Sequence, residues 1–378
     1  MQIRIGILVP RSDMFPTLGK DLLTGFKEGV NNSDNAPTIQ YLVEGIGAAA
    51  TDSLVRAAEK MILQEDVDLT ISFCSNHILE RLVKVFDAYK KPLIHVGLGS
   101  NVIKEMHHSP YVAYHSLNIW QAAYAAGKYA AEKYGKKGSI STSYYDGGYQ
   151  HSQAFVAGYT DHGGEIAHFY VAPMEYQKES YDAMIDGMTE ANPDVAFLLF
   201  SYKEGDKVLN VLSESELNGK IPFVAIPTLT DESVYESNHK LDGVVSVASW
   251  AFDDPNPVMK GFVDLMDEKH QTAPNIMHLL GYEMGQLMAS LYTEYECIPN
   301  DISEKLRNLT TDSPRGVLTY NSYGESQVDS FKIRKFNFNE VRYHNTVVDT
   351  MDTSITANLY SRFEALEYGG WQNPYICT

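Results

Sequence analysis

The chain has 378 residues, of which 44% are hydrophobic and 21% charged, and its length exceeds what one hydrophobic core usually fills. Its formal net charge of −19 argues against nucleic-acid and anionic-membrane binding, because both need a basic face. No stretch approaches the roughly 18 apolar residues of a membrane span, and no basic segment with an apolar run precedes residues 3–9. We expect two domains, in a protein that is either cytoplasmic or a mature form whose leader has been removed.

Strands and helices alternate along the first part of the chain. The apolar patterns predict strands at residues 3–9, 40–43, 67–73 and 93–96, and helices at residues 18–30, 52–64 and 78–86. A repeated strand–helix pattern implies a parallel sheet with right-handed crossovers. The fold class of this block is therefore α/β.

A second series of the same kind begins near residue 118. Strands are predicted at residues 139–143, 167–171, 195–200, 222–226 and 243–247, with helices between them. Prolines at 255 and 257 then interrupt regular structure, and helices are predicted at 258–270, 276–296 and 303–308. The last part, with runs at 316–320, 327–338 and 341–348, is typical of antiparallel strands. The sequence thus indicates two α/β blocks in one compact unit.

Small polar residues follow two neighbouring predicted strands. Ser75 and Asn76 come after the first strand, and residues 97–101 come after the next. In open parallel sheets, small ligands bind outside the carboxyl ends of the strands, and helix N-termini attract anions. The alternative is that Ser75 or Asn76 is a simple helix N-cap that needs no ligand. Both interpretations stay open at this point.

Enzyme motifs are incomplete or missing. Gly97 and Gly99 suggest a dinucleotide-binding turn, but Val102 stands where the third glycine belongs. No phosphate-binding GxxxxGK[ST], zinc-binding HExxH or hydrolase GxSxG motif occurs. His107 and His108 are adjacent, and adjacent residues rarely point at one metal ion. We therefore expect no catalysis, no metal and no cofactor, although dispersed Ser, His and Asp side chains leave a hydrolase as a minor alternative.

Several long segments, in order, match one known family. They are IRIGILVPRSDMFPTLGKDLLTGFKEGVN, ISFCSNHILERLVKVFDAYKKPLIHVGLGSN, SPYVAYHSLNIWQAAYAAGKYAAEKYG, YYDGGYQHSQAFVAGYTDHGGEI and DDPNPVMKGFVDLMDEKHQTAPNIMHLLGYEMGQLM. Over residues 3–338 the chain resembles the type I periplasmic solute-binding proteins of the leucine/isoleucine/valine-binding group. The resemblance implies two Rossmann-like lobes that close on a small molecule, joined by crossovers near residues 115–118, 246–249 and 327–331.

The resemblance also implies a domain division. The first lobe is expected to comprise residues 1–117 and 250–327, and the second lobe residues 118–249 and 328–350. Residues 351–378 are expected to form an extension packed on the lobes. A cysteine at position 74 is disulfide-bonded in some members, but no cysteine occurs at residues 44–51, where its partner would lie, so Cys74 is expected to be a buried free thiol. Whether Cys297 and Cys377 pair is left open.

Family ligand contacts carried onto this sequence coincide with predicted strand ends. The candidate ligand-binding residues are Ser75, Asn76, Leu98, Gly99, Ser100, Tyr149, Tyr202, Thr228, Leu18, Phe15, Arg11 and Trp250. The resemblance gives Ser75 the ligand carboxylate and Ser100 the hydroxyl of the following turn. Leu18 replaces an aromatic residue, and Thr228 stands at or near the acidic residue that pairs with an ammonium group. The wall opposite Ser75 is therefore expected to offer Thr228, Tyr202 and Tyr149 and to carry no formal negative charge, and the ligand to have no ammonium or one paired elsewhere.

Each of the other candidates has a structural alternative. Tyr149 and Tyr202 belong to a set of 25 tyrosines, most of which are expected at the half-buried surface. Phe15 and Trp250 are also explained by core packing, and Arg11 by a solvated loop position.

The expected function is extracytoplasmic capture of a small polar ligand, such as an amino acid, amide, urea-like molecule or small carboxylic acid, between the two lobes. Its expected partners are the permease subunits of an ABC importer. The alternative is a sensory or regulatory flytrap that is coupled to a signalling partner. No nucleic acid, direct membrane span or covalent chemistry is expected.

Overall fold

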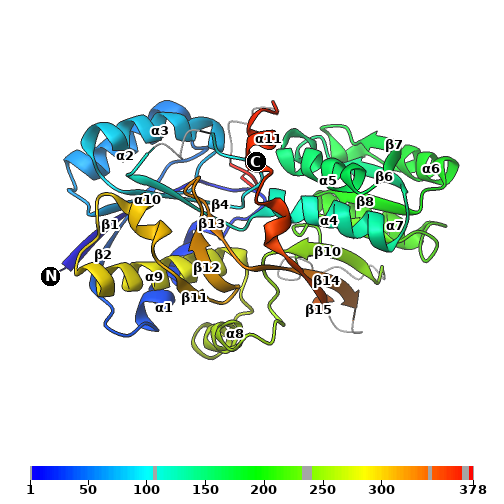
Figure 1. The fold of residues 1–378 in the computed structure, drawn as a ribbon. Coiled ribbons are helices and arrows are strands. Elements are labelled where there is room, and N and C mark those ends of the chain that lie inside the picture. Colours follow the sequence, from blue (N-terminus) through cyan, green and yellow to red (C-terminus); the bar gives the residue numbers. More distant parts are fainter. Residues whose placement is uncertain (1, 105–108, 232–240, 339–342, 368–373, 378) are drawn as a thin grey trace.

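The computed structural model describes residues 2–104, 109–231, 241–338, 343–367 and 374–377. Two lobes lie side by side, and helices flank the sheet of each (Figure 1). This two-lobe α/β arrangement with parallel sheets confirms the predicted fold class.

The first lobe contains a five-stranded parallel sheet in the order β2-β1-β3-β4-β5. Its elements are β1 (Gln2–Val9), α1 (Leu18–Asn31), β2 (Thr38–Gly45), α2 (Thr51–Leu63), β3 (Leu69–Ser72), α3 (Asn76–Tyr89), β4 (Leu93–Gly97) and β5 (Val112–Ser116). Strands β3, β4 and β5 are buried along their whole length, including the polar residues that they contain.

The second lobe contains a seven-stranded sheet in the order β15-β14-β10-β9-β8-β6-β7. Its elements are α4 (Ile119–Lys133), β6 (Lys137–Thr142), the 3₁₀ helix η2 (Asp146–Gly148), α5 (Gln150–Asp161), β7 (Glu165–Val171), η3 (Tyr176–Lys178), α6 (Asp182–Ala191), β8 (Val195–Leu199), α7 (Tyr202–Glu214), β9 (Phe223–Ala225), β10 (Val244–Ala248), β14 (Ser330–Phe338), β15 (Tyr343–Asp352), η4 (Thr353–Thr356) and α11 (Tyr360–Glu364). Strands β6 to β10 are parallel to one another, whereas β14 pairs antiparallel with both of its neighbours, β10 and β15.

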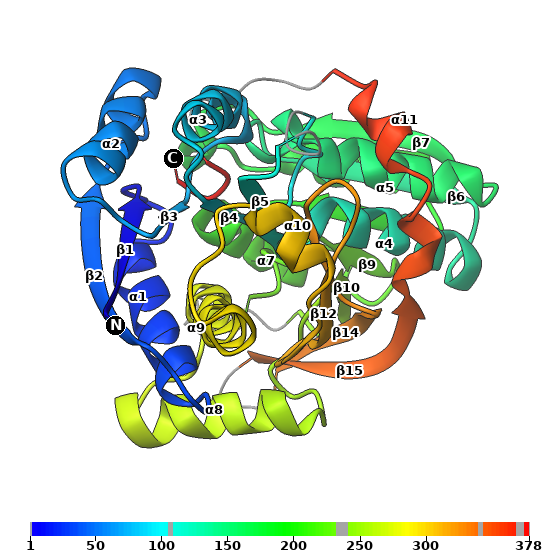
Figure 2. The same cartoon turned by 60° about the vertical axis from the view of Figure 1, so that its left-hand side comes forward.

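A further block joins the first lobe. It comprises α8 (Pro257–His270), α9 (Ile276–Tyr295), α10 (Ile302–Arg307) and a small sheet of β11 (Thr311–Ser313), β12 (Gly316–Tyr320) and β13 (Ser326–Gln327). Helix α9 packs along α1 (Figure 2). A Cβ added to Gly25 would lie 2.0 Å from the His278 carbonyl oxygen, and one added to Gly281 would lie 2.0 Å from that of Leu22. These glycines therefore let the two helix backbones touch.

The prediction of a single strand at residues 327–338 is wrong in one respect, because the structure has two strands, β13 and β14, in this region. Strand β13 belongs to the small sheet, and β14 pairs with β10 in the second lobe. Residues 328 and 329 between them make no ladder pairs because the chain passes from one lobe to the other there. The other two passages lie between β5 and α4 and between β10 and α8.

A buried ion pair ties these passages together. Arg315 donates from Nε and Nη2 to the two Glu283 carboxylate oxygens at 2.8 and 2.7 Å. Its Nη1 donates to the Ser116 carbonyl at 2.9 Å and to Ser249 Oγ at 3.0 Å, which are on two different passages. Burial alone would raise the pKa of Glu283, but the Arg315 charge and the bond from His115 hold it at about 2. The carboxylate is therefore ionised, and it holds the Arg315 side chain against two of the passages.

The state of the three cysteines follows from the fold. Cys74 is a buried free thiol, as predicted, and Cys297 and Cys377 are also free and do not pair. Among the described residues, no helix is long and apolar enough to cross a membrane.

Candidate functional site

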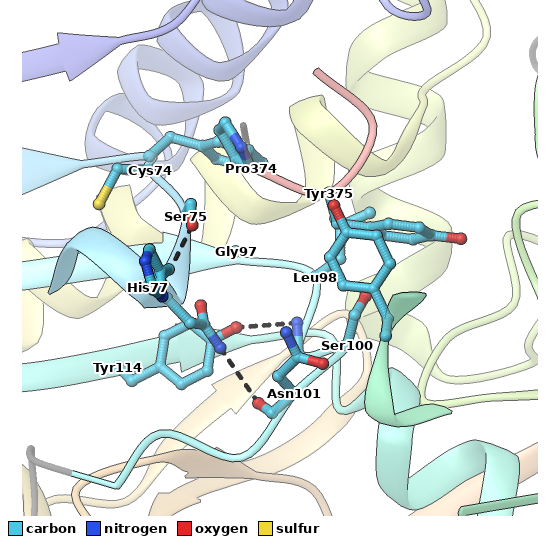
Figure 3. A pocket seen from close by; sticks show the side chains of 14 residues that line it. Cys74, Ser75, His77, Gly97, Leu98, Ser100, Asn101, Tyr114, Pro374 and Tyr375 are labelled. Atoms are coloured by element: carbon cyan, nitrogen blue, oxygen red, sulfur yellow. Dashed lines mark hydrogen bonds between the residues drawn. The ribbon is translucent and has the colours of Figure 1, made fainter. Parts of the chain in front are cut away.

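A cavity lies between the lobes at the carboxyl ends of β3 and β4 (Figure 3). It is lined by Phe73, Cys74, Ser75, Asn76, His77, Gly97, Leu98, Gly99, Ser100, Asn101, Tyr114, Tyr149, Pro374 and Tyr375. Its volume is about 30 Å³, which is room for one or two water molecules. Six of the predicted site residues line it, namely Ser75, Asn76, Leu98, Gly99, Ser100 and Tyr149.

Ser75 and Asn76 lie at the start of α3, where a parallel strand meets a helix N-terminus. Ser75 Oγ caps this helix and accepts a hydrogen bond from the His77 N–H at 3.1 Å. Asn76 Nδ2 donates to the Asn101 carbonyl at 3.3 Å. The capping role is thus present, and the Ser75 side chain still borders the cavity.

Ser100 is different, because its side chain is only 5% exposed and its hydroxyl has no hydrogen-bond partner among the described residues. The turn before it requires glycine, since Gly99 has a φ of +72° and an added Cβ would lie 2.8 Å from the Asn118 nitrogen. The Gly99 N–H donates to the Tyr114 hydroxyl at 2.9 Å. A buried hydroxyl without a partner is costly, so Ser100 is suited to a polar atom of a bound molecule.

The lobes touch each other beside Ser100. The His151 N–H donates to the Ser100 carbonyl at 3.2 Å, and the Gln150 N–H donates to Asn101 Oδ1 at 2.7 Å. Gln150 Oε1 in turn accepts from the Val102 N–H at 2.8 Å. These bonds join the loop after β4 to the first turn of α5, so the lobes are closed on each other at this edge.

Polar side chains at the ends of adjacent second-lobe strands form a network that we call the second-lobe wall; its members, including the predicted site residue Thr228, contact Tyr375 and do not line the cavity themselves. Asp146 follows β6, Ser201 follows β8 and Thr228 follows β9, and these strands are neighbours in the sheet. The Asp146 carboxylate accepts from Ser143 Oγ at 2.7 Å and from Ser201 Oγ at 2.8 Å. Thr228 Oγ1 lies 3.0 Å from Ser201 Oγ. Burial raises the pKa of Asp146 above its ordinary value, and the bonds from Tyr375, Ser143 and Ser201 oppose that rise.

A carboxyl group that the sequence analysis did not anticipate, that of Asp146, thus lies beside Thr228 in this wall. The acidic position had been sought at Thr228, whereas Asp146 supplies the carboxylate from a neighbouring strand end. A second acid, Glu204, lies in α7 behind the wall, and burial together with the Asp146 charge raises its pKa to about 8. The available signal was an aspartate in the loop at 144–149, directly after a buried strand.

Two aromatic candidates lie behind the cavity. The Tyr202 hydroxyl donates to Asp231 at 3.4 Å, and its ring packs edge-on against Phe15 with 6.0 Å between centroids. Both side chains are buried, and neither lines the cavity. In this closed arrangement, Phe15 and Tyr202 therefore contribute to packing and not to the cavity lining.

The remaining candidates lie elsewhere for clear physical reasons. Leu18 begins α1 and belongs to the hydrophobic core, and Trp250 lies under the Arg334 guanidinium at 4.9 Å. Arg11 is exposed and pairs with Asp13 at 3.0 Å. None of these three lines the cavity. His107 and His108 lie outside the described residues, and the described part of the chain contains no group of three side chains suited to a metal ion.

Pro374 and Tyr375 were not anticipated as cavity residues. They belong to residues 374–377, near the C-terminal end of the chain, which is drawn in faint red in Figure 3. No local sequence pattern marks them, because their contacts join positions more than a hundred residues apart, such as Tyr375 with Thr228.

A curated relative aligns with about half of the chain. Leu/Ile/Val-binding protein homolog 6 from Brucella abortus is 23% identical over 179 residues, which are 46% of this chain and 44% of that protein. The chain thus spans less than half the length of the curated relatives that it matches.

Solved structures match nearly the whole chain. An ABC transporter substrate-binding protein from Sphaerobacter thermophilus has a TM-score of 0.83 at 20% identity, covering 93% of this chain and 98% of that one. A solute-binding protein of an ABC transporter from Rhodopseudomonas palustris, in complex with 3,4-dihydroxybenzoic acid, has a TM-score of 0.78 at 20% identity and the same coverage. A leucine-binding protein from Thermotoga maritima has a TM-score of 0.71 at 15% identity, covering 93% and 99%.

The family model described as periplasmic binding protein matches residues 2–332, which is most of the sequence. Together with the two-lobe fold and the strand-end cavity, this match places the chain in the periplasmic binding protein family.

Proposed function

We propose that this protein is an extracytoplasmic solute-binding protein that captures a small polar molecule between its lobes and presents it to the permease subunits of an ABC importer. The observation that carries this proposal is a cavity between the lobes that is lined by the ends of β3 and β4 and by Tyr149 of the second lobe, and in which the Ser100 hydroxyl has no partner among the described residues. The fold relatives named above act in ABC transport, which supports the same role.

The two walls suit different parts of a solute. On the first-lobe wall, Ser75, Ser100 and the N-terminus of α3 favour a carboxylate or carbonyl oxygen. On the second-lobe wall, Asp146 accepts hydrogen bonds and favours a donor group, either a hydroxyl or an ammonium. Amino acids, amides, urea-like molecules and small carboxylic acids all fit this division. The lack of an acid at Thr228 argued against an α-amino acid, but Asp146 offers an acceptor for its ammonium group.

The proposed mechanism is a population shift. A solute that contacts both walls favours the closed form, and the importer recognises that form. The three passages, two of which Arg315 contacts, would act as the hinge between a first lobe of residues 1–117 and 250–327 and a second lobe of residues 118–249 and 328–350. Residues 351–378 would form an extension that packs on both lobes. The solute leaves chemically unchanged.

A thermal-shift screen tests this function. At least one amino acid, amide or small carboxylic acid, including benzoates, should raise the melting temperature, because a ligand that binds only the folded state stabilises it. The compound recovered after incubation should be unchanged, and its turnover would contradict the proposal. Neighbouring permease and ATPase genes would support transport, whereas an adjacent kinase or regulator would support the signalling alternative.

A further inference from the structure

Residues 374–377 form a tight turn inside the cleft. The Cys377 N–H donates to the Pro374 carbonyl at 3.0 Å, and the side chains of Tyr375, Ile376 and Cys377 are buried. Figure 3 shows Pro374 and Tyr375 extending toward the side of Ser75 and Ser100. A segment far along the chain thus lies between the cavity-lining residues of the first lobe and the strand ends of the second lobe.

The Tyr375 hydroxyl contacts all three strand ends of the second-lobe wall. It donates to Asp146 Oδ1 at 2.5 Å and lies 2.9 Å from Ser201 Oγ and 3.3 Å from Thr228 Oγ1. Burial and the neighbouring Asp146 charge raise the pKa of Tyr375 well above 10, so the phenol keeps its proton and donates. The wall therefore offers a phenolic hydroxyl one carboxyl acceptor, Asp146, and two neighbouring hydroxyl groups.

The Tyr375 ring lies in an aromatic cage. The Tyr145 ring is parallel to it at 6.0 Å between centroids, and the Tyr149 and His151 rings meet it edge-on at 4.6 and 5.3 Å. Such arrangements favour an aromatic ring over an aliphatic chain of the same size. The cage and the hydroxyl partners together are specific for a phenol.

The same segment is held by both lobes, as a bound solute would be. Ser12 Oγ, which follows β1 of the first lobe, donates to the Ile376 carbonyl, and the Tyr145 hydroxyl of the second lobe donates to the Pro374 carbonyl at 3.1 Å. Ile376 has a φ of +67°, a left-handed conformation that is strained for a β-branched residue. Contacts on both sides hold this strained turn in place.

We propose that the second-lobe wall is a binding site for a para-substituted phenol, and that residues 374–377 are its intramolecular occupant, which such a solute must displace. This inference rests on the proposed solute-binding function and specifies its substrate class. Displacement is required because the cavity of about 30 Å³ is far smaller than the several hundred Å³ of typical ligand pockets. The apparent affinity of the solute is its intrinsic affinity multiplied by the fraction of molecules in which the site is empty, so the occupant lowers it.

Thiol labelling tests whether Tyr375 holds the segment in the cleft. Cys377 is buried with a pKa raised to about 12, and Cys74 is buried on the first lobe with the same shift, so both react slowly. In a Cys297→Ser background, Tyr375→Phe should speed the reaction of Cys377 with a disulfide reagent by about tenfold, because it removes only the hydroxyl contacts. The Cys74 rate, read from the same digest by peptide mass, should stay unchanged. Equal Cys377 rates in the two proteins would overturn the inference.

A side-chain analogue tests the chemistry of the site. By calorimetry, p-cresol should bind Tyr375→Ala at least about tenfold more tightly than it binds the wild type, because the variant leaves the cage empty. Toluene, which lacks the hydroxyl, should bind the variant about tenfold more weakly than p-cresol does. Equal binding of p-cresol to both proteins, or equal binding of toluene and p-cresol, would overturn the phenol assignment.

The two proposals fail in different ways. If no compound in the thermal-shift screen stabilises the wild type but Cys377 labelling and p-cresol binding behave as expected, the transport role is wrong and the occupied phenol site stands. If a solute stabilises the wild type while labelling of Cys377 is unchanged by Tyr375→Phe, solute binding stands and the occupant is wrong.

Discussion

The two walls of the cleft are built alike but differ in what their polar groups contact. Both place small polar side chains at the carboxyl ends of parallel strands, β3 and β4 in the first lobe and β6, β8 and β9 in the second. On the first wall the Ser100 hydroxyl has no partner among the described residues. On the second wall Asp146, Ser201 and Thr228 all contact the Tyr375 hydroxyl. The same strand-end geometry thus gives one half-site that is available and one that is occupied.

Asp146→Ala should have the largest effect. Its carboxylate accepts bonds from Ser143, Ser201 and Tyr375 in a buried position, so three hydroxyl groups would lose their acceptor. We expect the free energy of unfolding, measured in urea, to fall by about 3 kcal/mol. Asp146→Asn is the matched control and should cost less, since it keeps the shape and one acceptor oxygen. A loss below about 0.5 kcal/mol for the alanine variant would show that the wall is not a connected network.

Ser201→Ala should have an intermediate effect. The Ser201 hydroxyl donates to Asp146 at 2.8 Å and lies 2.9 Å from the Tyr375 hydroxyl. We expect a loss of about 1 to 2 kcal/mol in the same unfolding experiment. In a double-mutant cycle with Tyr375→Phe, the two losses should be less than additive because the side chains share one network. Strict additivity would argue against their contact.

Glu204 should make stability depend on pH. Its folded-state pKa is raised from 4.5 to about 8, mainly by burial and then by Asp146, so the folded state holds the proton more tightly than the unfolded state. This contribution is fully present below about pH 4.5 and is lost as the pH rises through about 8. Urea unfolding of the wild type across this range should therefore show falling stability. Glu204→Gln, which cannot ionise, should flatten the profile, and an unchanged profile would refute the raised pKa.

Ser100→Ala should have the smallest effect on stability. The hydroxyl is buried and makes no hydrogen bond within the described structure, so its removal should cause no loss of unfolding free energy. The same variant should weaken binding of a carboxylic-acid solute by about 1 to 3 kcal/mol if the bond is charge-assisted. Unchanged binding in calorimetry would remove Ser100 from the site.

The fold and the first wall were predictable because their signals are local. Buried parallel strands have mainly apolar sequences, and Ser75 and Ser100 each lie three residues after the end of one of them. Asp146 also follows a strand, but its proximity to Ser201 depends on the order of strands in the sheet, which the sequence does not state. Tyr375 has no local signal at all, since its position depends on contacts with Asp146 and Ser201 that form only in the folded chain.

The most direct test of the two-wall account is a crystal structure of the protein with a solute identified by the thermal-shift screen. The account predicts solute atoms within hydrogen-bond distance of both Ser100 Oγ and Asp146 Oδ1, with the Tyr375 hydroxyl no longer on Asp146. A solute bound elsewhere while Tyr375 keeps its 2.5 Å bond to Asp146 would contradict it.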